Sequence, residues 1–227
     1  MSETNGPRAK GREAVEAALI EAASDLLADL GPRATTVRDI AARAGVNHAQ
    51  VHHYFGSKRA LLRAAMSHMA TKHHQAVLAL AGGRPVPPPL AVPVDDQRYW
   101  RAAVRATIEG DIELAGVEVT DGVSVSRTVL ENLTRHFGLE EPNIDLKVQL
   151  AQGTATQLGW LALEPFLFLV AGVTDEEQEE VRQRVRHSIA SGRFAVNTAE
   201  ETQRWGEQLH QVQQATPVQQ PQDRSEP

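Results

Sequence analysis

The sequence has 227 residues, of which 41% are hydrophobic, and it carries a formal net charge of −6. This length suits a small domain joined to a larger one, and the net negative charge argues against a protein that coats nucleic acid. Because the sequence contains no cysteine, it excludes disulfides, zinc ribbons and cysteine nucleophiles.

The charge is unevenly distributed along the chain. Residues 1–81 hold 10 Lys/Arg against 7 Asp/Glu, whereas residues 82–227 hold 13 against 22. The first part, here called the head, is basic, and the second, here called the body, is acidic. This asymmetry is typical of local DNA contact by one domain, because phosphate attraction arises at the contacting face. The polar stretch 1–12 has no apolar core of the kind that a signal peptide needs, so we expect a cytoplasmic protein.

The first predicted helix covers about residues 13–30, where apolar residues recur at helical spacing. Gly31 and Pro32 predict its end, because glycine supplies a left-handed cap and proline bars continuation. Thr36 and Asp39 have the spacing of a capping box, with the Asp39 side chain reaching back to the Thr36 amide. They predict a short second helix that ends near residue 43.

A third helix is predicted directly after a tight turn at residues 44–46. Asn47 and Gln50 repeat the cap arrangement at its start, and it reaches Tyr54. Two short helices three residues apart form a helix-turn-helix unit. Gly56 and Ser57 then break and cap the chain before a long helix over 58–80, which is long enough to connect two domains.

The rest of the sequence predicts an all-α body. A proline-rich connection at 82–93 precedes helical patterns at about 96–115, 122–137, 144–170 and 174–192, with a weaker one at 196–213. The apolar stretch 158–173 contains Glu164 and Pro165 and is too short for a membrane span, so we interpret it as part of a buried helix. The predicted organisation is a flexible arm over 1–12, a DNA-binding domain over 13–60, a ligand-binding and dimerisation domain over 61–213, and a disordered tail over 214–227.

The run from Ile20 to Met66 resembles the DNA-binding domain of the TetR/AcrR family of regulators. The resemblance rests on Leu-Gly at the end of a helix, Thr-Thr-Val-x-x-Ile-Ala, Ala-Gly-Val and an aromatic-Phe-x-x-Lys-x-x-Leu segment, in that order and spacing. It implies an all-helical homodimer that binds a palindromic operator and releases it on binding a small molecule. The chain departs from the family at His52, where a tyrosine is usual, and at Val51, where a leucine is usual.

The DNA-facing residues are predicted from the chemistry of the grooves and the backbone. Gln50 can pair with adenine, Ala49 can touch a thymine methyl group, and His48 can donate to a purine. Phosphate contact should fall to side chains at helix starts and to cations. The full predicted set is Thr36, Val37, Arg38, Asn47, His48, Ala49, Gln50, His52, His53, Tyr54 and Lys58, although the Val37 side chain itself is expected in the core.

A mainly apolar effector is expected in the body, and no cofactor or metal is expected. The predicted pocket wall is Trp100, Val104, Ile108, Leu133, Phe137 and Trp160, with core packing as the alternative for each. Helices 144–170 and 174–192 are expected to pair with their symmetry mates, as in proteins that this chain resembles. Two other functions stay open: a constitutive regulator without a ligand, and a metal-dependent enzyme, since His48 and His52 lie four residues apart.

Overall fold

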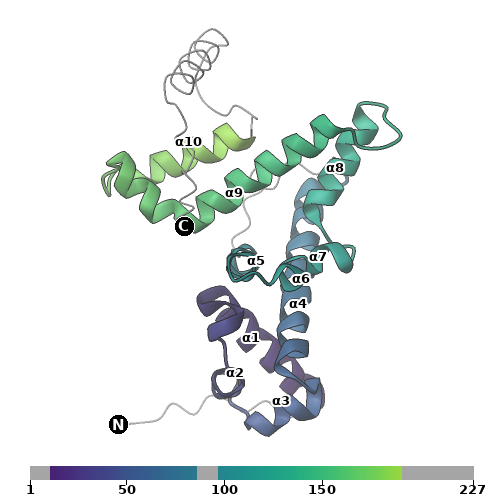
Figure 1. Cartoon of the computed structure of the whole chain (residues 1–227), viewed down its shortest axis with the longest axis vertical. Helices are drawn as coiled ribbons and strands as arrows, with labels where there is room; N and C mark the ends of the chain where they lie inside the picture. The colour runs from purple at the N-terminus through teal and green to yellow at the C-terminus, as the bar shows by residue number, and fades with distance from the viewer. Residues whose placement is uncertain (1–10, 86–96, 191–227) are drawn as a thin grey trace, which may run out of the picture. The chain divides into compact units, whose positions relative to one another are not determined.

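The computed structural model describes residues 11–85 and 97–190 (Figure 1). Within these ranges the chain forms α-helices and no strand, which confirms the all-α fold. The predicted arm up to residue 10, most of the proline-rich connection, the helix at 196–213 and the tail lie outside the described residues. The helices are α1 (Arg12–Ala34), α2 (Val37–Ala44), α3 (His48–Phe55), α4 (Lys58–Ala81), α5 (Arg98–Ile108), α6 (Ile112–Ala115), α7 (Val117–Thr120), α8 (Val125–His136), α9 (Ile144–Ala171) and α10 (Gln178–Ala190).

The helix break predicted at Gly31 is present as a kink inside α1. Gly31 has φ 81° and ψ 171°, a positive φ combined with an extended ψ rather than the left-handed cap that we expected. Pro32 follows and starts one further helical turn, which suits proline because the first amide of a turn needs no acceptor. The chain therefore changes direction at Gly31 and enters α2 almost at once.

Side-chain caps start the next three helices as the sequence predicts, with one difference in detail. The Thr36 hydroxyl accepts a hydrogen bond from the Asp39 amide at 3.2 Å, and Asn47 and Ser57 cap α3 and α4 in the same way. The Asp39 carboxylate, however, accepts from the Thr36 hydroxyl at 2.6 Å instead of reaching the Thr36 amide. A carboxylate this close to a hydroxyl forms the stronger charge-assisted bond.

One hydrophobic core joins the first four helices to α5, α6 and α7. Its fully buried side chains include Leu19 and Leu27 of α1, Val51 of α3, and Leu61 and Met66 of α4. A second cluster packs the end of α4 on α8 through Val77, Ala81, Val125 and Val129. The first core crosses the predicted domain boundary at residue 60, and that boundary stays a prediction.

The helix predicted over 96–115 is divided into α5 and α6. Gly110 takes φ 80° between them, and the Asp111 side chain accepts from the Leu114 amide at 3.1 Å to start α6. A glycine at positive φ followed by an aspartate cap ends one helix and begins another. The helix predicted from residue 174 likewise begins later, at Gln178, because residues 175–177 form a turn in which the Glu177 carboxylate accepts from the Thr174 amide at 2.9 Å.

The expectation that the apolar stretch 158–173 is buried is wrong for the single chain. Across α9 the buried residues are Leu146, Gln157 and Phe168, whereas Leu169 is 79% exposed. By length and composition α9 could cross a membrane, and few of its residues are buried. Apolar composition predicts that a helix face becomes covered but does not identify the partner that covers it.

Candidate nucleic-acid interface

Helices α2 and α3 form a helix-turn-helix whose turn depends on Gly45. The Gly45 backbone has φ 67° and ψ 29°, a left-handed conformation that glycine adopts without steric cost. The Val46 amide then donates to the Ala41 carbonyl at 3.0 Å, which closes the end of α2. Val51 is fully buried and anchors α3 on the core, so the opposite face of α3 is directed away from the core.

That outer face of α3 carries the residues predicted to read bases. Five of the predicted residues are exposed, and Gln50 is half-buried: the exposed ones are Asn47, His48, Ala49, His52 and His53. The His52 ring nitrogen Nδ1 lies 3.4 Å from the Gly56 carbonyl oxygen at the end of the helix. Short polar side chains on one exposed helix face can reach base edges in the major groove.

The residues predicted to contact phosphates lie at the starts of α2 and α4 and at the end of α3. Thr36 and Arg38 are exposed, and Lys58 is half-buried in the first turn of α4. Tyr54 and Val37 are half-buried and pack against the core. For Val37 this leaves the backbone amide, in the first turn of α2, as the group able to meet a phosphate.

Arg12, which was predicted to lie in the flexible arm, is a cation beside this surface. It begins α1, and its guanidinium carbon lies 5.9 Å from the centre of the Tyr54 ring. Its Nε atom also donates to Glu16 at 2.9 Å. Arginine over an aromatic ring gains from the ring quadrupole, so Arg12 holds positive charge next to Tyr54.

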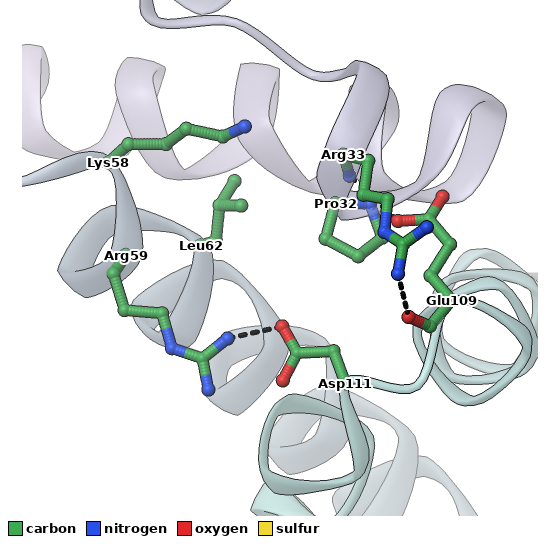
Figure 2. A pocket seen from close by; sticks show the side chains of 7 residues that line it. All are labelled: Pro32, Arg33, Lys58, Arg59, Leu62, Glu109 and Asp111. Carbon is green, nitrogen blue, oxygen red and sulfur yellow. Dashed lines mark hydrogen bonds and ion pairs between the residues drawn. The ribbon is translucent and has the colours of Figure 1, made fainter.

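A pocket of about 400 Å³ lies between the start of α4, the kink of α1 and the turn before α6 (Figure 2). Figure 2 shows Lys58 extending above Leu62 from the left, the Arg59–Asp111 pair below, and Arg33 and Glu109 on the right. The Arg33 amide donates to the Glu109 carboxylate at 2.8 Å, and the Arg33 guanidinium donates to the Glu109 carbonyl at the same distance. The pocket therefore lies between a predicted phosphate-binding residue and two residue pairs, one an ion pair and one joined by hydrogen bonds that involve the backbone.

Those pairs belong to a row of contacts between basic residues of α1 and α4 and the acidic segment, residues 109–121. Arg59 binds Asp111 and, at 3.0 Å, Glu113. Arg63 binds Asp121 at 2.7 Å, and Ser67 donates to the same carboxylate. Burial alone would raise the pKa of Asp111, but the hydrogen bond from Arg59 holds it below its ordinary value. These ion pairs attach the acidic segment to the DNA-binding head.

A second charge cluster joins α1, α4 and α5 around Glu21. The Glu21 carboxylate accepts from His68 at 2.9 Å, from Lys72 at 3.0 Å and from Arg98 at 3.0 Å. Arg98 also binds Asp25 at 2.9 Å. Burial alone would raise the pKa of Glu21, but the hydrogen bonds from Lys72, Arg98 and His68 lower it to about 2.

This lowered pKa predicts an acid-dependent loss of stability. The contribution of Glu21 is present above its ordinary pKa of 4.5 and disappears as the pH falls through about 2. We expect Glu21→Gln to reduce the free energy of unfolding by about 1 kcal/mol at pH 7, a modest value because the site is partly exposed. Thermal melts from pH 7 to pH 2 should show this difference shrinking between about pH 4.5 and about pH 2. The exposed Glu13→Gln is the matched control, and a constant difference for Glu21→Gln at every pH would contradict the prediction.

The six residues predicted to form a pocket wall do not line one common pocket. Trp100 is 6% exposed and lies in the core, where its ring is 4.9 Å from that of Tyr99, so core packing describes it. Val104 and Ile108 both line a hollow between α5 and α9. Leu133 packs against the second cluster, Phe137 is 60% exposed, and Trp160 stands edge-on to Phe168 on α9.

The described residues bring no three histidine or acidic side chains together in a way that could hold a metal ion. His48 and His52 lie on the exposed face of α3. Two histidines at helical spacing without a third ligand do not complete a metal site.

Comparison with known proteins identifies this arrangement. A family model described as bacterial regulatory proteins, tetR family, matches residues 19–65. The HTH-type transcriptional repressor Rv3405c of Mycobacterium tuberculosis is 31% identical over 180 residues, covering 79% of this chain and 89% of the relative. The HTH-type transcriptional regulator BetI of Rhizobium meliloti is 46% identical over 55 residues, 24% of this chain and 27% of the relative.

Among solved structures, a tetR-family transcriptional regulator from Streptomyces coelicolor is 20% identical, with a TM-score of 0.49 and coverage of 93% of this chain and 94% of that one. The family model matches the segment that contains α2 and α3, and the similarity to Rv3405c extends far beyond it. The chain therefore belongs to the TetR family of bacterial transcriptional regulators.

Proposed function

We propose that this regulator is a cytoplasmic repressor that binds a palindromic operator as a homodimer and releases it on binding a small molecule. The observation that carries the DNA-binding part is the exposed polar face of α3, opposite the buried Val51 and next to Lys58. The similarity to a relative that is named a repressor supports the sign of regulation. No catalytic role is assigned.

The recognition surface divides into reading and positioning residues. Asn47, His48, Ala49, Gln50 and His52 read bases from α3, while Thr36, Arg38, Lys58 and Tyr54 bind phosphates. Hydrogen bonds to base edges carry sequence information, whereas phosphate contacts fix register and supply affinity for all sequences. His53 lies beside Tyr54, with ring centres 4.9 Å apart, and supports that ring.

A test of this division compares Lys58→Ala with Gln50→Ala. Lys58→Ala should weaken binding to all DNA and lower the slope of the salt dependence by about one unit, because one phosphate contact is lost. Gln50→Ala should instead cost about 1–3 kcal/mol on the operator and little on unrelated DNA. Gel shifts at several salt concentrations measure both effects, with the exposed Arg127→Ala of α8 as the charge-matched control. If both variants fail in the same way, the division is wrong.

Dimerisation is proposed to use α9 and α10, because several apolar side chains of α9 are exposed in the single chain. The most exposed of these on α9 are Ile144, Phe166, Leu169 and Val170. A two-fold dimer presents two recognition helices to half-sites about 34–36 Å apart or a multiple of that distance. Both heads then bind the operator. One recognition helix alone contacts too few base pairs to distinguish the operator from other DNA.

The route from an effector to DNA is proposed to be the contacts of the head with the acidic segment and with α5. A ligand changes operator affinity only if it binds more tightly to one of two protein conformations, in which the heads are placed for operator binding or are not. A preference of about 3 kcal/mol would change operator affinity by roughly a hundredfold. Because Trp100 fills the core, the effector is expected outside that cluster.

The ligand response is tested separately from DNA binding. A thermal-shift screen against metabolites identifies compounds that stabilise the protein, and operator affinity is then measured with each compound. If compounds bind but operator affinity never changes, the chain is the constitutive regulator that the sequence left open.

A further inference from the structure

The hollow between α5 and α9 combines two arginines with an apolar wall. It has a volume of about 180 Å³ and is lined by Arg101, Val104, Arg105, Ile108, Leu161 and Ala162. Arg101 and Arg105 lie four residues apart and therefore on one face of α5, as do Val104 and Ile108. The volume is below the roughly 300–1,000 Å³ of drug-sized sites, so a small molecule is the appropriate occupant.

The protein balances only one of the two positive charges at this hollow. Arg101 binds Asp29 at 3.1 Å, a pair in which both side chains are nearly half exposed. Arg105 donates through Nε to the Ala28 carbonyl at 3.0 Å, and among the described residues no carboxylate pairs with it. A guanidinium presents five donors in a fixed fork that matches a carboxylate. The apolar neighbours favour an organic anion over inorganic phosphate. Ile108 is 76% exposed, so a ligand with an apolar part would gain free energy by covering this side chain.

The same two arginines hold the end of α1. Asp29 and Ala28 precede the kink at Gly31 by two and three residues, and α1 is the first helix of the DNA-binding head. Helix α5 contacts α1 and also α9 (Figure 1). A carboxylate that binds Arg101 and Arg105 would therefore compete with Asp29 and Ala28 of α1 for their guanidinium N–H groups.

We propose that a small organic carboxylate with an apolar body binds between α5 and α9 and competes with α1 for Arg101 and Arg105. This site rests on the ligand-responsive function proposed above and specifies the chemical class of the effector. The carboxylate takes the guanidinium donors, and its apolar body covers Val104, Ile108 and Leu161. The weakened attachment of α1 then lowers affinity for the operator.

The experiment measures binding of benzoate and hexanoate to the full chain by calorimetry, with acetate and the neutral benzyl alcohol and 1-hexanol as comparison probes. We expect one or both of the larger acids to bind, and acetate and the alcohols to bind at least tenfold more weakly. Arg105→Gln should reduce the affinity for the acids about tenfold, whereas Arg127→Gln, an exposed arginine on α8, should not. Ile108→Glu should abolish binding, whereas Ile112→Glu, an exposed isoleucine on α6 that does not line the hollow, should preserve it.

Failure of both acids to bind the wild type, or equal affinity in Arg105→Gln and Arg127→Gln, overturns the site. Operator affinity provides an independent readout, because the acid should lower it in the wild type, whereas in Arg105→Gln, which already lacks the bond to Ala28, the acid should change it little. Binding without any change in operator affinity overturns the competition with α1. Loss of operator binding by the ligand-free wild type would instead contradict the proposed function, and circular dichroism of each variant checks that it is folded.

Discussion

Replacing Gly31 by alanine is expected to reduce the free energy of unfolding by about 2–4 kcal/mol, a large fraction of the stability of a domain this size. Gly31 has φ 81° and ψ 171°, a region of backbone conformation that is essentially limited to glycine. A Cβ atom at this position would also lie 2.3 Å from Oε1 of Glu109, far inside any tolerated contact.

The clash at Gly31 cannot be relieved without loss elsewhere. The Glu109 carboxylate could turn away, but it would then give up the 2.8 Å hydrogen bond from the Arg33 amide. The Cβ atom of Arg105 lies 3.4 Å from the added carbon, at the limit of ordinary van der Waals contact, so Glu109 is the residue that must move. The substitution should therefore both destabilise the fold and loosen the attachment of α1 to α5.

Chemical denaturation of Gly31→Ala beside Gly45→Ala measures this effect. Gly45 also has a positive φ, 67°, but a Cβ atom there meets nothing within 4 Å. Gly45→Ala should cost about 1 kcal/mol, the price of the left-handed backbone alone. Equal destabilisation by the two variants would show that contact with Glu109 contributes nothing at Gly31.

The elements of the head could be predicted closely because their signals are local. A hydroxyl or amide side chain just before an apolar helical run marks each helix start, and Thr36, Asn47 and Ser57 do cap α2, α3 and α4. A cap depends on residues two or three positions apart, so it can be read from one segment. The burial of Val51 likewise follows from the helical period of α3.

The body was predicted less well because its contacts are distant in sequence. The division of α5 from α6 depends on Gly110 and Asp111, and the periodic apolar residues on either side obscured it. Arg59 pairs with Asp111 and Arg33 with Glu109, partners that lie 52 and 76 residues apart. The excess of base in the head is interpreted as a sign of DNA contact, and composition alone could not assign these pairs between head and body.

The predicted pocket wall shows the same limitation in its apolar residues. Trp100 and Val104 both lie on α5 and were both predicted to line a pocket, yet one is in the core and the other lines a hollow. Helical periodicity identifies which side of a helix is apolar, but the packing of other helices decides whether space remains beside it. Arg101 and Arg105 gain their significance only when α1 and α9 are seen to contact α5.

Replacing Leu169 by aspartate is expected to separate the dimer and lower operator affinity by about 10²–10⁴-fold. Leu169 is 79% exposed in the single chain and lies on α9 near Phe166 and Val170, which are exposed as well. Two-fold symmetry places every substitution in the interface twice, so two charges would have to be buried in each dimer. Loss of the second head removes the gain from two linked contacts with one operator.

Light scattering at micromolar concentration measures the mass, and gel shifts measure operator affinity. Leu80→Asp is the control, because Leu80 is also an exposed leucine, at 53%, and lies on α4, outside the proposed α9–α10 interface. Circular dichroism should find both variants folded, since exposed substitutions outside a core usually change stability by about 0.5 kcal/mol or less. The wild type and Leu80→Asp should have the mass of a dimer, and Leu169→Asp the mass of a monomer.

The apolar face of α9 has a second physical explanation, which the same proteins test. A helix of this length and composition could also associate with a lipid bilayer, where exposed leucine and phenylalanine side chains lose contact with water. Co-sedimentation with phospholipid vesicles should therefore be negligible for wild type, because the dimer buries this face. A wild type that is monomeric in light scattering and sediments with vesicles would assign α9 to lipid instead, and the paired-head mechanism would then lack the contact that holds the two heads at a fixed spacing.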